Sequence, residues 1–453
     1  MPNNHSTLTA LFTDIANAIR SKAGTTDPIK ADAFPSAIRA IETTGGGGAG
    51  AAGDYRAMIG MVEGTLSGAY TNYSAKTVTP YALRFCQQAE TLAFPEASTI
   101  SPGAFYDLNG LKSVNLNRVR NLDYQCFRSC NNLETVNIEN CLSLNSEVFA
   151  NCAKLKSVTI DSLEYIGSSA FQSCKALQTL NGPSVKGIWI CGLSGAGFSH
   201  VSFPLLQYIG ARAFAYCTNL LEIELPTAII LRELCFSNCT NLSYVKMDMY
   251  TGRDPAVFPF PSLIGNQGNQ GSIFENCTGL KEAHFPEMLE IRAEFFRSCY
   301  KLEYVNAPKV EFMSDGFNYC SSLKEINFPV CSVIGYDCFW QCYSLSKAII
   351  PNCTHISLHG FVSCALASLS LPKLINLSSL AFSGCSKLSA IYLLGSSVAT
   401  LQNVNAFQQT PITVLDYLGY YGSIYVPGDL VSVYQSATNW SLVSSRITAY
   451  LGS

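Results

Sequence analysis

Apolar residues recur along most of this chain at a spacing of about 22 residues. Each copy begins with a phenylalanine, followed by a cysteine three residues later and a leucine six residues later. After the leucine, apolar and polar residues alternate and a proline often follows, as in Leu220–Pro226. Alternation is typical of a half-buried β-strand, and proline is typical of a strand end. The ten clear copies begin at Phe127, Phe149, Phe171, Phe214, Phe236, Phe274, Phe296, Phe317, Phe339 and Phe382.

A second apolar column lies five residues before the phenylalanine, and glycine or serine often follows it. Its members include Ile166, Ile209, Ile291, Ile334 and Ile356. A column of this kind predicts coils that stack in register, with a turn leading back to a helical or irregular side. Weaker copies extend the pattern. We therefore expect an α/β repeat solenoid, a right-handed arc of about 15 coils with short parallel strands, roughly 70 Å long.

The repeat and the segments around it predict five parts in the chain. Residues 81–412 form the solenoid, with an insertion at 248–272 that interrupts the repeat. Residues 54–80 and 413–453 are expected to cap its two apolar ends, as terminal units of a solenoid must. Residues 44–53 are rich in glycine and predict a flexible linker. Residues 1–43 precede that linker and predict a small helical module.

The amino-terminal module has two interpretations. One helical face carries apolar side chains, and Gly24 is placed to end that helix. The module is either a helical hairpin packed on itself or an oligomerising or docking element, because so few residues make a poor core alone. The apolar face consists of Leu8, Leu11, Phe12, Ile15 and Ile19.

Composition narrows the classes of function. Charged residues make up 13% of the chain and its formal net charge is −3. A nucleic-acid partner would require clustered Lys and Arg, so we expect none. No run of 18 apolar residues occurs, which argues against a membrane span. The first 22 residues lack the unbroken apolar core of a secretory signal peptide.

The 19 cysteines follow the repeat. Twelve lie at the third place after the first residue of a copy, and six more recur at two other places. A recurrent position favours a structural role, in which free cysteine acts as a small apolar side chain. The alternative is a ladder of disulfides or thiolate ligands between neighbouring coils. We favour reduced thiols, because a secreted disulfide framework normally comes with a signal peptide and paired spacing.

Catalytic and metal-binding chemistry has little support in this sequence. The chain has five histidines, and only His355 and His359 lie near cysteines, Cys353 and Cys364. In the repeat frame both cysteines belong to structural columns, whereas a zinc site needs four ligands on one side. We expect no metal, no cofactor and no catalytic residues, and a chain that is not an enzyme.

The repeat itself resembles the BspA-like leucine-rich repeats. The matching core, Ala-Phe-x-x-Cys-x-x-Leu, occurs for example at Ala170–Leu177 and Ala213–Leu220. Such repeats are found on bacterial and protist cell-surface proteins and in bacteriophage proteins, and the resemblance implies a role in adhesion. Leu11–Lys22 with Ala33–Pro35 is similar to the opening of tail-associated proteins in phages and prophages of Gram-positive gut bacteria.

The polar places beside the buried strand residues are the candidate ligand face. In the early coils these places hold serine, threonine and asparagine, whereas four later coils hold aromatic and charged residues. Tyrosine supplies contact area at low entropic cost, so the later coils predict a contact patch; the alternative is an ordinary solvated strand surface. The patch comprises Tyr244, Lys246, Glu282, His284, Tyr304, Asn306, Glu325 and Asn327.

Three functions are compatible with these features. The leading hypothesis is a phage tail-associated adhesion protein, located in the virion, that binds a host cell-surface protein or glycan. Its amino-terminal module would attach to other virion proteins, or join copies of the chain into a homo-oligomer. The alternatives are a bacterial surface or secreted adhesin, and a scaffold that organises other proteins.

Overall fold

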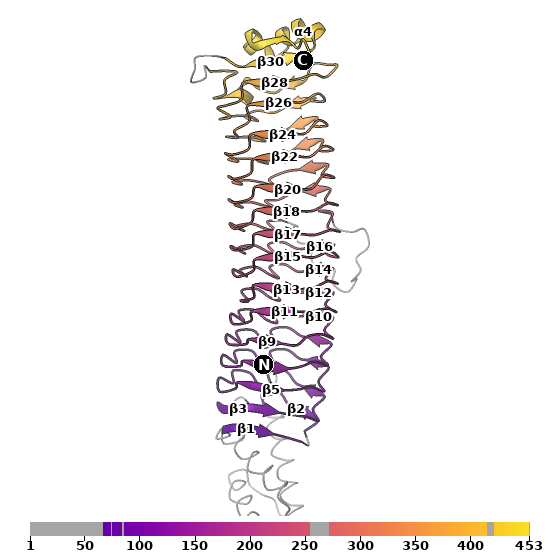
Figure 1. Ribbon diagram of the computed structural model, residues 1–453, viewed down its shortest axis with the longest axis vertical. Helices are drawn as coiled ribbons and strands as arrows, with labels where there is room; N and C mark the ends of the chain where they lie inside the picture. Colours follow the sequence, from indigo (N-terminus) through magenta and orange to yellow (C-terminus); the bar gives the residue numbers. More distant parts are fainter. Residues whose placement is uncertain (1–66, 74, 84–85, 254–270, 415–420, 453) are drawn as a thin grey trace, which may run out of the picture.

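The protein is a long solenoid of stacked coils (Figure 1). The computed structural model describes residues 67–73, 75–83, 86–253, 271–414 and 421–452. These residues form a parallel-strand solenoid of about 16 turns. The predicted helical module, the linker, most of the predicted amino-terminal cap and most of the 248–272 insertion lie outside the described residues. What was expected of them stays a prediction.

Each regular coil contributes one strand to each of two stacks of parallel strands, here called ladders. Hydrogen bonding divides the first ladder into five sheets and the second into two. The first ladder contains the strands that the alternating pattern predicts, and it is formed by β1 (Ser67–Thr71), β3 (Gln88–Ala93), β5 (Ser113–Asn115), β7 (Thr135–Asn137), β9 (Ser157–Val158), β11 (Thr179–Asn181), β13 (His200–Ser202), β15 (Glu222–Glu224), β17 (Tyr244–Lys246), β18 (Glu282–His284), β20 (Tyr304–Asn306), β22 (Glu325–Asn327), β24 (Lys347–Ile349), β26 (Ser368–Ser370), β28 (Ala390–Tyr392), β30 (Ser423–Val426) and β31 (Ile447–Ala449).

The second ladder lies where the sequence predicted only a turn and a helical or irregular side. Its strands have two residues each, and in most of them the second residue lies in the predicted aliphatic column, five places before the first residue of a copy. It is formed by β2 (Thr77–Val78), β4 (Thr99–Ile100), β6 (Asn121–Leu122), β8 (Ser143–Leu144), β10 (Tyr165–Ile166), β12 (Gly187–Ile188), β14 (Tyr208–Ile209), β16 (Ile230–Leu231), β19 (Glu290–Ile291), β21 (Phe312–Met313), β23 (Val333–Ile334), β25 (His355–Ile356), β27 (Asn376–Leu377) and β29 (Thr400–Leu401).

The expected α/β class is therefore wrong for the described part of the chain. Helices there are few and lie close to the carboxyl terminus: η3 (Val404–Phe407), η4 (Gly428–Leu430), α4 (Val431–Ser436) and η5 (Trp440–Arg446). The predicted register is confirmed, since Ile166 pairs with Leu144 on one side and with Ile188 on the other. Strands on two sides give neighbouring coils a similar spacing at both ladders. This agrees with the nearly straight axis in the view of Figure 1.

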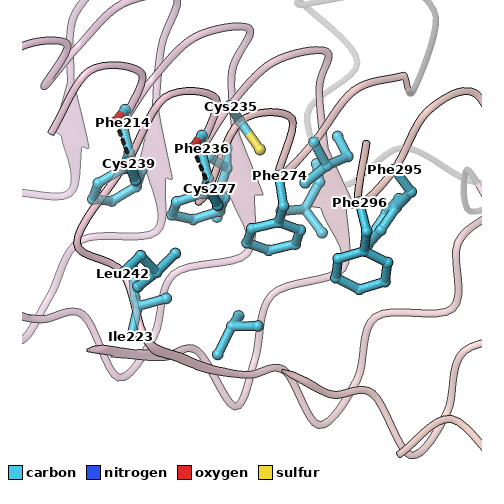
Figure 2. Packing of buried hydrophobic residues seen from close by; sticks show 14 of the residues in the cluster. Phe214, Ile223, Cys235, Phe236, Cys239, Leu242, Phe274, Cys277, Phe295 and Phe296 are labelled. Carbon is cyan, nitrogen blue, oxygen red and sulfur yellow. Dashed lines mark hydrogen bonds between the residues drawn. The ribbon is translucent and has the colours of Figure 1, made fainter. Parts of the chain in front are cut away.

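A column of phenylalanine rings fills the interior. Phe317, Phe339 and Phe361 stack with centroids 5.2 and 5.1 Å apart, and all three are fully buried. Figure 2 shows the same arrangement at Phe214, Phe236 and neighbouring coils. The recurrence of phenylalanine at one place in the repeat thus follows from stacking, since each ring contacts its equivalents in the coils on either side.

The cysteine column lies beside the rings. The Sγ atoms of Cys239 and Cys277 lie 3.1 Å from the carbonyl oxygens of Phe214 and Phe236, to which they donate (Figure 2). The same thiol-to-carbonyl bond recurs from Cys130 to Cys385. All 19 cysteines are free, and Cys191 alone is not fully buried. The recurrent cysteine is therefore a small apolar side chain that also donates to the preceding coil.

Each coil turns through a left-handed backbone residue two places after its phenylalanine. Ser129, Asn151 and Tyr216 occupy this place with φ of 63°, 63° and 61°. Glycine stands there only occasionally, as at Gly195 and Gly384. Residues with a Cβ atom are less stable in this conformation by roughly 1–2 kcal/mol. Several coils therefore carry a local conformational cost that stacking with their neighbours offsets.

Replacing Tyr216 should reveal this cost. The Tyr216 side chain is 57% exposed, so truncating it removes little packing. We expect Tyr216→Gly to be more stable than Tyr216→Ala by about 1 kcal/mol in urea unfolding, because only glycine adopts this backbone without strain. The same pair of substitutions at the exposed residue Lys154 is the control, and there alanine should be the more stable. Equal stability of the two Tyr216 variants would contradict this explanation.

The carboxyl-terminal residues cover the last coil. Strand β30 is joined in parallel by β31, the last strand of the first ladder. Trp440 is buried, its ring centroid lies 6.0 Å from that of Phe407, and its Nε1 donates to the carbonyl oxygen of Ala399 at 2.7 Å. The indole thus covers the end of the phenylalanine column.

Candidate functional site

The predicted contact residues lie on four neighbouring strands of the first ladder. Val245, Ala283, Val305 and Ile326 occupy the middle of these strands and are buried, so the flanking residues point outward. Strands β17, β18 and β20 are hydrogen-bonded in one sheet, and β22 pairs with β24 in the next. The structure therefore brings six of the eight residues into one sheet and places the other two on the following coil (Figure 1).

A row of three rings lies at the centre of this surface. The His284 ring centroid is 5.3 Å from that of Tyr244 and 5.7 Å from that of Tyr304. The residue numbers of Tyr244 and His284 differ widely because the insertion lies between them, yet β17 and β18 are paired as adjacent strands. Contact with the imidazole restricts both phenol rings, so little side-chain entropy remains to be lost on binding.

One ring nitrogen of His284 lacks a hydrogen-bond partner in the part of the chain that the structure describes. His284 Nε2 is buried and has no hydrogen-bond partner among the described residues, and the nearest carboxylate oxygen, Glu282 Oε2, is 3.6 Å away. An unsatisfied buried polar atom is costly in a folded protein.

Charged side chains surround the ring row. Lys246 Nζ lies 3.6 Å from Asp248 Oδ1, and Lys347 Nζ lies 2.7 Å from Glu325 Oε1. Burial first, and then the nearby Glu224 carboxylate, raise the pKa of the Tyr244 hydroxyl. This hydroxyl is therefore a hydrogen-bond donor across the physiological pH range.

Two carboxylates of this surface were not predicted. Glu222 and Glu224 lie on β15, and their register partners on β17 are Tyr244 and Lys246. Both are exposed. They occupy the same places in the repeat as the predicted residues, so the repeat frame contained the signal, and only the chosen boundary of the patch left them out.

A second aromatic group on this ladder was also missed. Tyr392 on β28 and Tyr425 on β30 stack with centroids 4.8 Å apart, and Tyr450 meets Tyr392 edge-on at 5.7 Å. The early strands differ: Thr135 and Thr179 and their neighbours carry short uncharged side chains. Aromatic residues are therefore concentrated in the later part of the ladder.

The histidines and cysteines with metal-like spacing do not converge. His359 Nδ1 lies 2.8 Å from Asp337 Oδ1, and His355 Nδ1 lies 2.9 Å from Thr354 Oγ1. Cys353 is buried with its Sγ directed at a backbone carbonyl. Across the described ranges, no group of three or more His, Cys, Asp or Glu residues is arranged to hold a metal ion. Within these same ranges, no helix is long and apolar enough to cross a membrane.

Comparison with protein families settles what kind of chain this is. The model for the BspA type leucine-rich repeat region matches residues 76–191, 193–315, 265–366 and 310–424. The chain belongs to this family. Among curated proteins, no match was found. Proteins built from leucine-rich repeats generally act as binding scaffolds, and this family membership supports the fold predicted from the repeat.

One solved structure agrees with this chain at the level of the fold, and a second is named beside it for its sequence match. A leucine-rich repeat protein from Bacteroides ovatus is 19% identical; the match covers 74% of this chain and 91% of that one, with a TM-score of 0.52. A leucine-rich cell surface protein from Faecalibacterium prausnitzii is 18% identical over 63% of this chain and 87% of that one, with a TM-score of 0.35. At these identities the likeness concerns architecture alone.

Proposed function

We propose that this protein is a non-enzymatic adhesin that binds a cell-surface partner through the exposed face of β15, β17, β18, β20 and β22. The observation that supports this most directly is the Tyr244–His284–Tyr304 ring row. It combines exposed aromatic area, restricted side chains and a buried nitrogen without a partner. Rigid aromatic groups within a polar and charged surface are typical of binding sites.

The family supports a location at the bacterial cell surface or outside the cell. BspA-like repeat proteins are often cell-surface proteins, as the resemblance implies. The phage-tail hypothesis gains no support from the family match or from the solved structures, and the module that would attach to a virion lies outside the described residues. We therefore place the surface adhesin, first considered as the alternative, ahead of the virion protein.

A binding assay with matched variants tests this function. Labelled full chain is incubated with panels of bacterial and animal cells, beside a Tyr244→Ala/Tyr304→Ala double variant. Loss of two aromatic contacts at the centre of an interface should weaken binding about tenfold or more. The control is Thr135→Ala/Thr179→Ala, two substitutions at equivalent places of the same ladder.

The outcomes of this cell-binding assay distinguish the proposed contact surface from the alternatives. Wild-type binding that the threonine control retains and the tyrosine variant loses would support an adhesin with this contact surface. Equal binding by the tyrosine variant would place the contact elsewhere on the solenoid. If the wild-type chain bound none of the cells, the scaffold hypothesis would replace the adhesin.

A further inference from the structure

Carboxylates and phenols alternate along one line of this surface. The first outward residue of five consecutive first-ladder strands is Glu222, Tyr244, Glu282, Tyr304 and Glu325. Register confirms that they are neighbours up to β20, since Glu222 pairs with Tyr244, Tyr244 with Glu282, and Glu282 with Tyr304. The five residues form what we call the Glu–Tyr column, which runs along the solenoid axis.

The column has a repeat of two coils. Neighbouring strands lie about 4.8 Å apart, so its carboxylates recur at about 9.6 Å. A polyproline II helix has 3 residues per turn with a rise of 3.1 Å, so equivalent side chains recur at about 9.3 Å. From Glu222 to Glu325 the two repeats drift apart by only about 0.6 Å.

The side-chain repeats of other regular backbone conformations do not match the spacing of this column. In an extended strand, side chains on one face recur at about 6.6 Å, which matches neither one coil nor two. Two turns of an α-helix rise about 10.8 Å, so a mismatch of about 2.4 Å accumulates by Glu325. Among the regular backbone conformations, polyproline II fits the column most closely.

The charges favour a cationic ligand. On β15 to β24 and the residue preceding each strand, three lysines have carboxylate neighbours: Lys246 with Asp248, Lys324 with Glu303 and Lys347 with Glu325. Glu222, Glu224 and Glu282 are exposed, and the one further lysine of this range is Lys281, directly before β18. Only His200, 4.0 Å from Glu222, and His284, 3.6 Å from Glu282, add positive charge when protonated.

The tyrosines of the Glu–Tyr column can contact the proline rings of such a ligand. Proline-rich segments in the polyproline II conformation dock against aromatic side chains, because their preformed shape loses little entropy. Tyr304 is 51% exposed, and Tyr244 is half-buried with its ring held by His284. A pyrrolidine ring can pack on each phenol while the cationic side chain of the next repeat reaches a carboxylate.

From this geometry we propose that the Glu–Tyr column binds a cationic polyproline II segment with lysine or arginine at every third position, lying along the solenoid axis. This inference rests on the proposed function, because it names the class of partner for the same face. Glu222 and Glu282 are the main anion sites, since Glu325 is shared with Lys347.

Three synthetic peptides test the partner class with the full chain. The first repeats Pro-Pro-Arg over a length that spans β15 to β22. The second repeats Pro-Pro-Gln, which keeps the conformation without the charge, and the third repeats Gly-Ser-Arg, which keeps the charge spacing without the conformation. Fluorescence anisotropy should show that the first peptide binds about tenfold or more tightly than either control, and that its binding weakens as salt is raised.

Substitutions then locate the site. Glu282→Gln and Tyr304→Ala should each weaken binding of the Pro-Pro-Arg peptide about five- to tenfold. The matched control is Glu139→Gln, which changes the net charge equally at an exposed residue of an early coil. If Glu139→Gln had the same effect as Glu282→Gln, or if all three peptides bound alike, the proposal would be overturned.

Failure of this inference can be told apart from failure of the proposed function. If the tyrosine variant loses cell binding but the Pro-Pro-Arg peptide does not bind, the face is a contact surface and the partner class is wrong. In that case, capture of the wild-type chain but not of a Tyr304 variant on a glycan array would identify the partner as a glycan. If neither cells nor peptides bind, both the proposed function and the partner class are wrong.

Discussion

Raising the pH above about 9 should unfold this protein cooperatively, because its core contains a ladder of neutral thiols. Burial raises the pKa of Cys86 and Cys141 to about 11, and that of Cys126 and Cys174 to about 12. Desolvation of the thiolate is the first cause in each case. The ordinary value is 9.0, so an unfolded chain ionises at a pH where the folded core cannot.

The direction of the effect follows from proton binding. A group whose pKa is higher in the folded state contributes stability that is complete below the unfolded pKa and is lost as the pH rises toward the folded value. Each such thiol removes about 1.4 kcal/mol per pH unit in the window between about 9 and 11 or 12. Since whole domains are stable by only about 5–15 kcal/mol, a few thiols are sufficient.

Circular dichroism in reducing buffer at increasing pH measures this transition. We expect a steep loss of the native signal between about pH 9 and pH 10.5. Burial also raises the pKa of the Tyr434 hydroxyl, which adds one further group. The control is a triple variant, Cys126→Ala/Cys174→Ala/Cys353→Ala, each position having a pKa of about 12.

The triple variant should show a weaker dependence on pH. The free energy of unfolding of the wild type should fall with pH more steeply than that of the variant. The difference between the two slopes should be about 4 kcal/mol per pH unit, because three thiols have been removed. A wild-type chain that keeps its native signal through pH 11, or a triple variant with an unchanged slope, would show that the thiol ladder does not control alkaline stability.

Phe339→Ala should be the most damaging single substitution of an interior ring. Phe339 is fully buried and stacks on Phe317 and Phe361 at 5.2 and 5.1 Å. Truncation removes both stacking contacts and leaves a cavity that the flanking coils cannot fill without losing register. A loss of about 3–5 kcal/mol is expected.

The chain offers its own control for this substitution. Leu193 replaces phenylalanine in one coil, where Phe198 and Phe203 instead pack edge-on against Phe214 with centroids 6.2 Å away. Phe339→Leu should therefore cost much less, about 1 kcal/mol. Urea unfolding followed by circular dichroism compares the two. Equal losses for alanine and leucine would mean that stacking, and not volume, determines the stability of the column.

Interior positions were predictable from the sequence because burial repeats with the coil. Phe171, Cys174 and Leu177 occupy fixed places in the repeat, and all three are buried as expected. Residues at one place in the repeat meet the same neighbours in every coil, so selection for packing leaves a period in the sequence. The second-ladder strands were missed because two residues such as Tyr165–Ile166 are too short to show an alternation of their own.

Contacts between outward side chains were less predictable from the sequence than the interior positions. The sequence suggested that Tyr244, His284 and Tyr304 belong to one patch, but the ring row depends on how side chains of adjacent coils turn toward each other. Glu222 occupies the same place in the repeat as Tyr244 and Glu282, and only the chosen boundary of the patch left it out.

By itself, the sequence determined the repeat, the stacking register and the identity of the interior columns, because each buried side chain must fit an equivalent neighbour above and below it. Only the tertiary structure decided that strands line both sides of the coil. It also decided which outward residues alternate along the axis. Exposed side chains are under no packing constraint within their own coil, so their neighbours become known only when the coils are stacked.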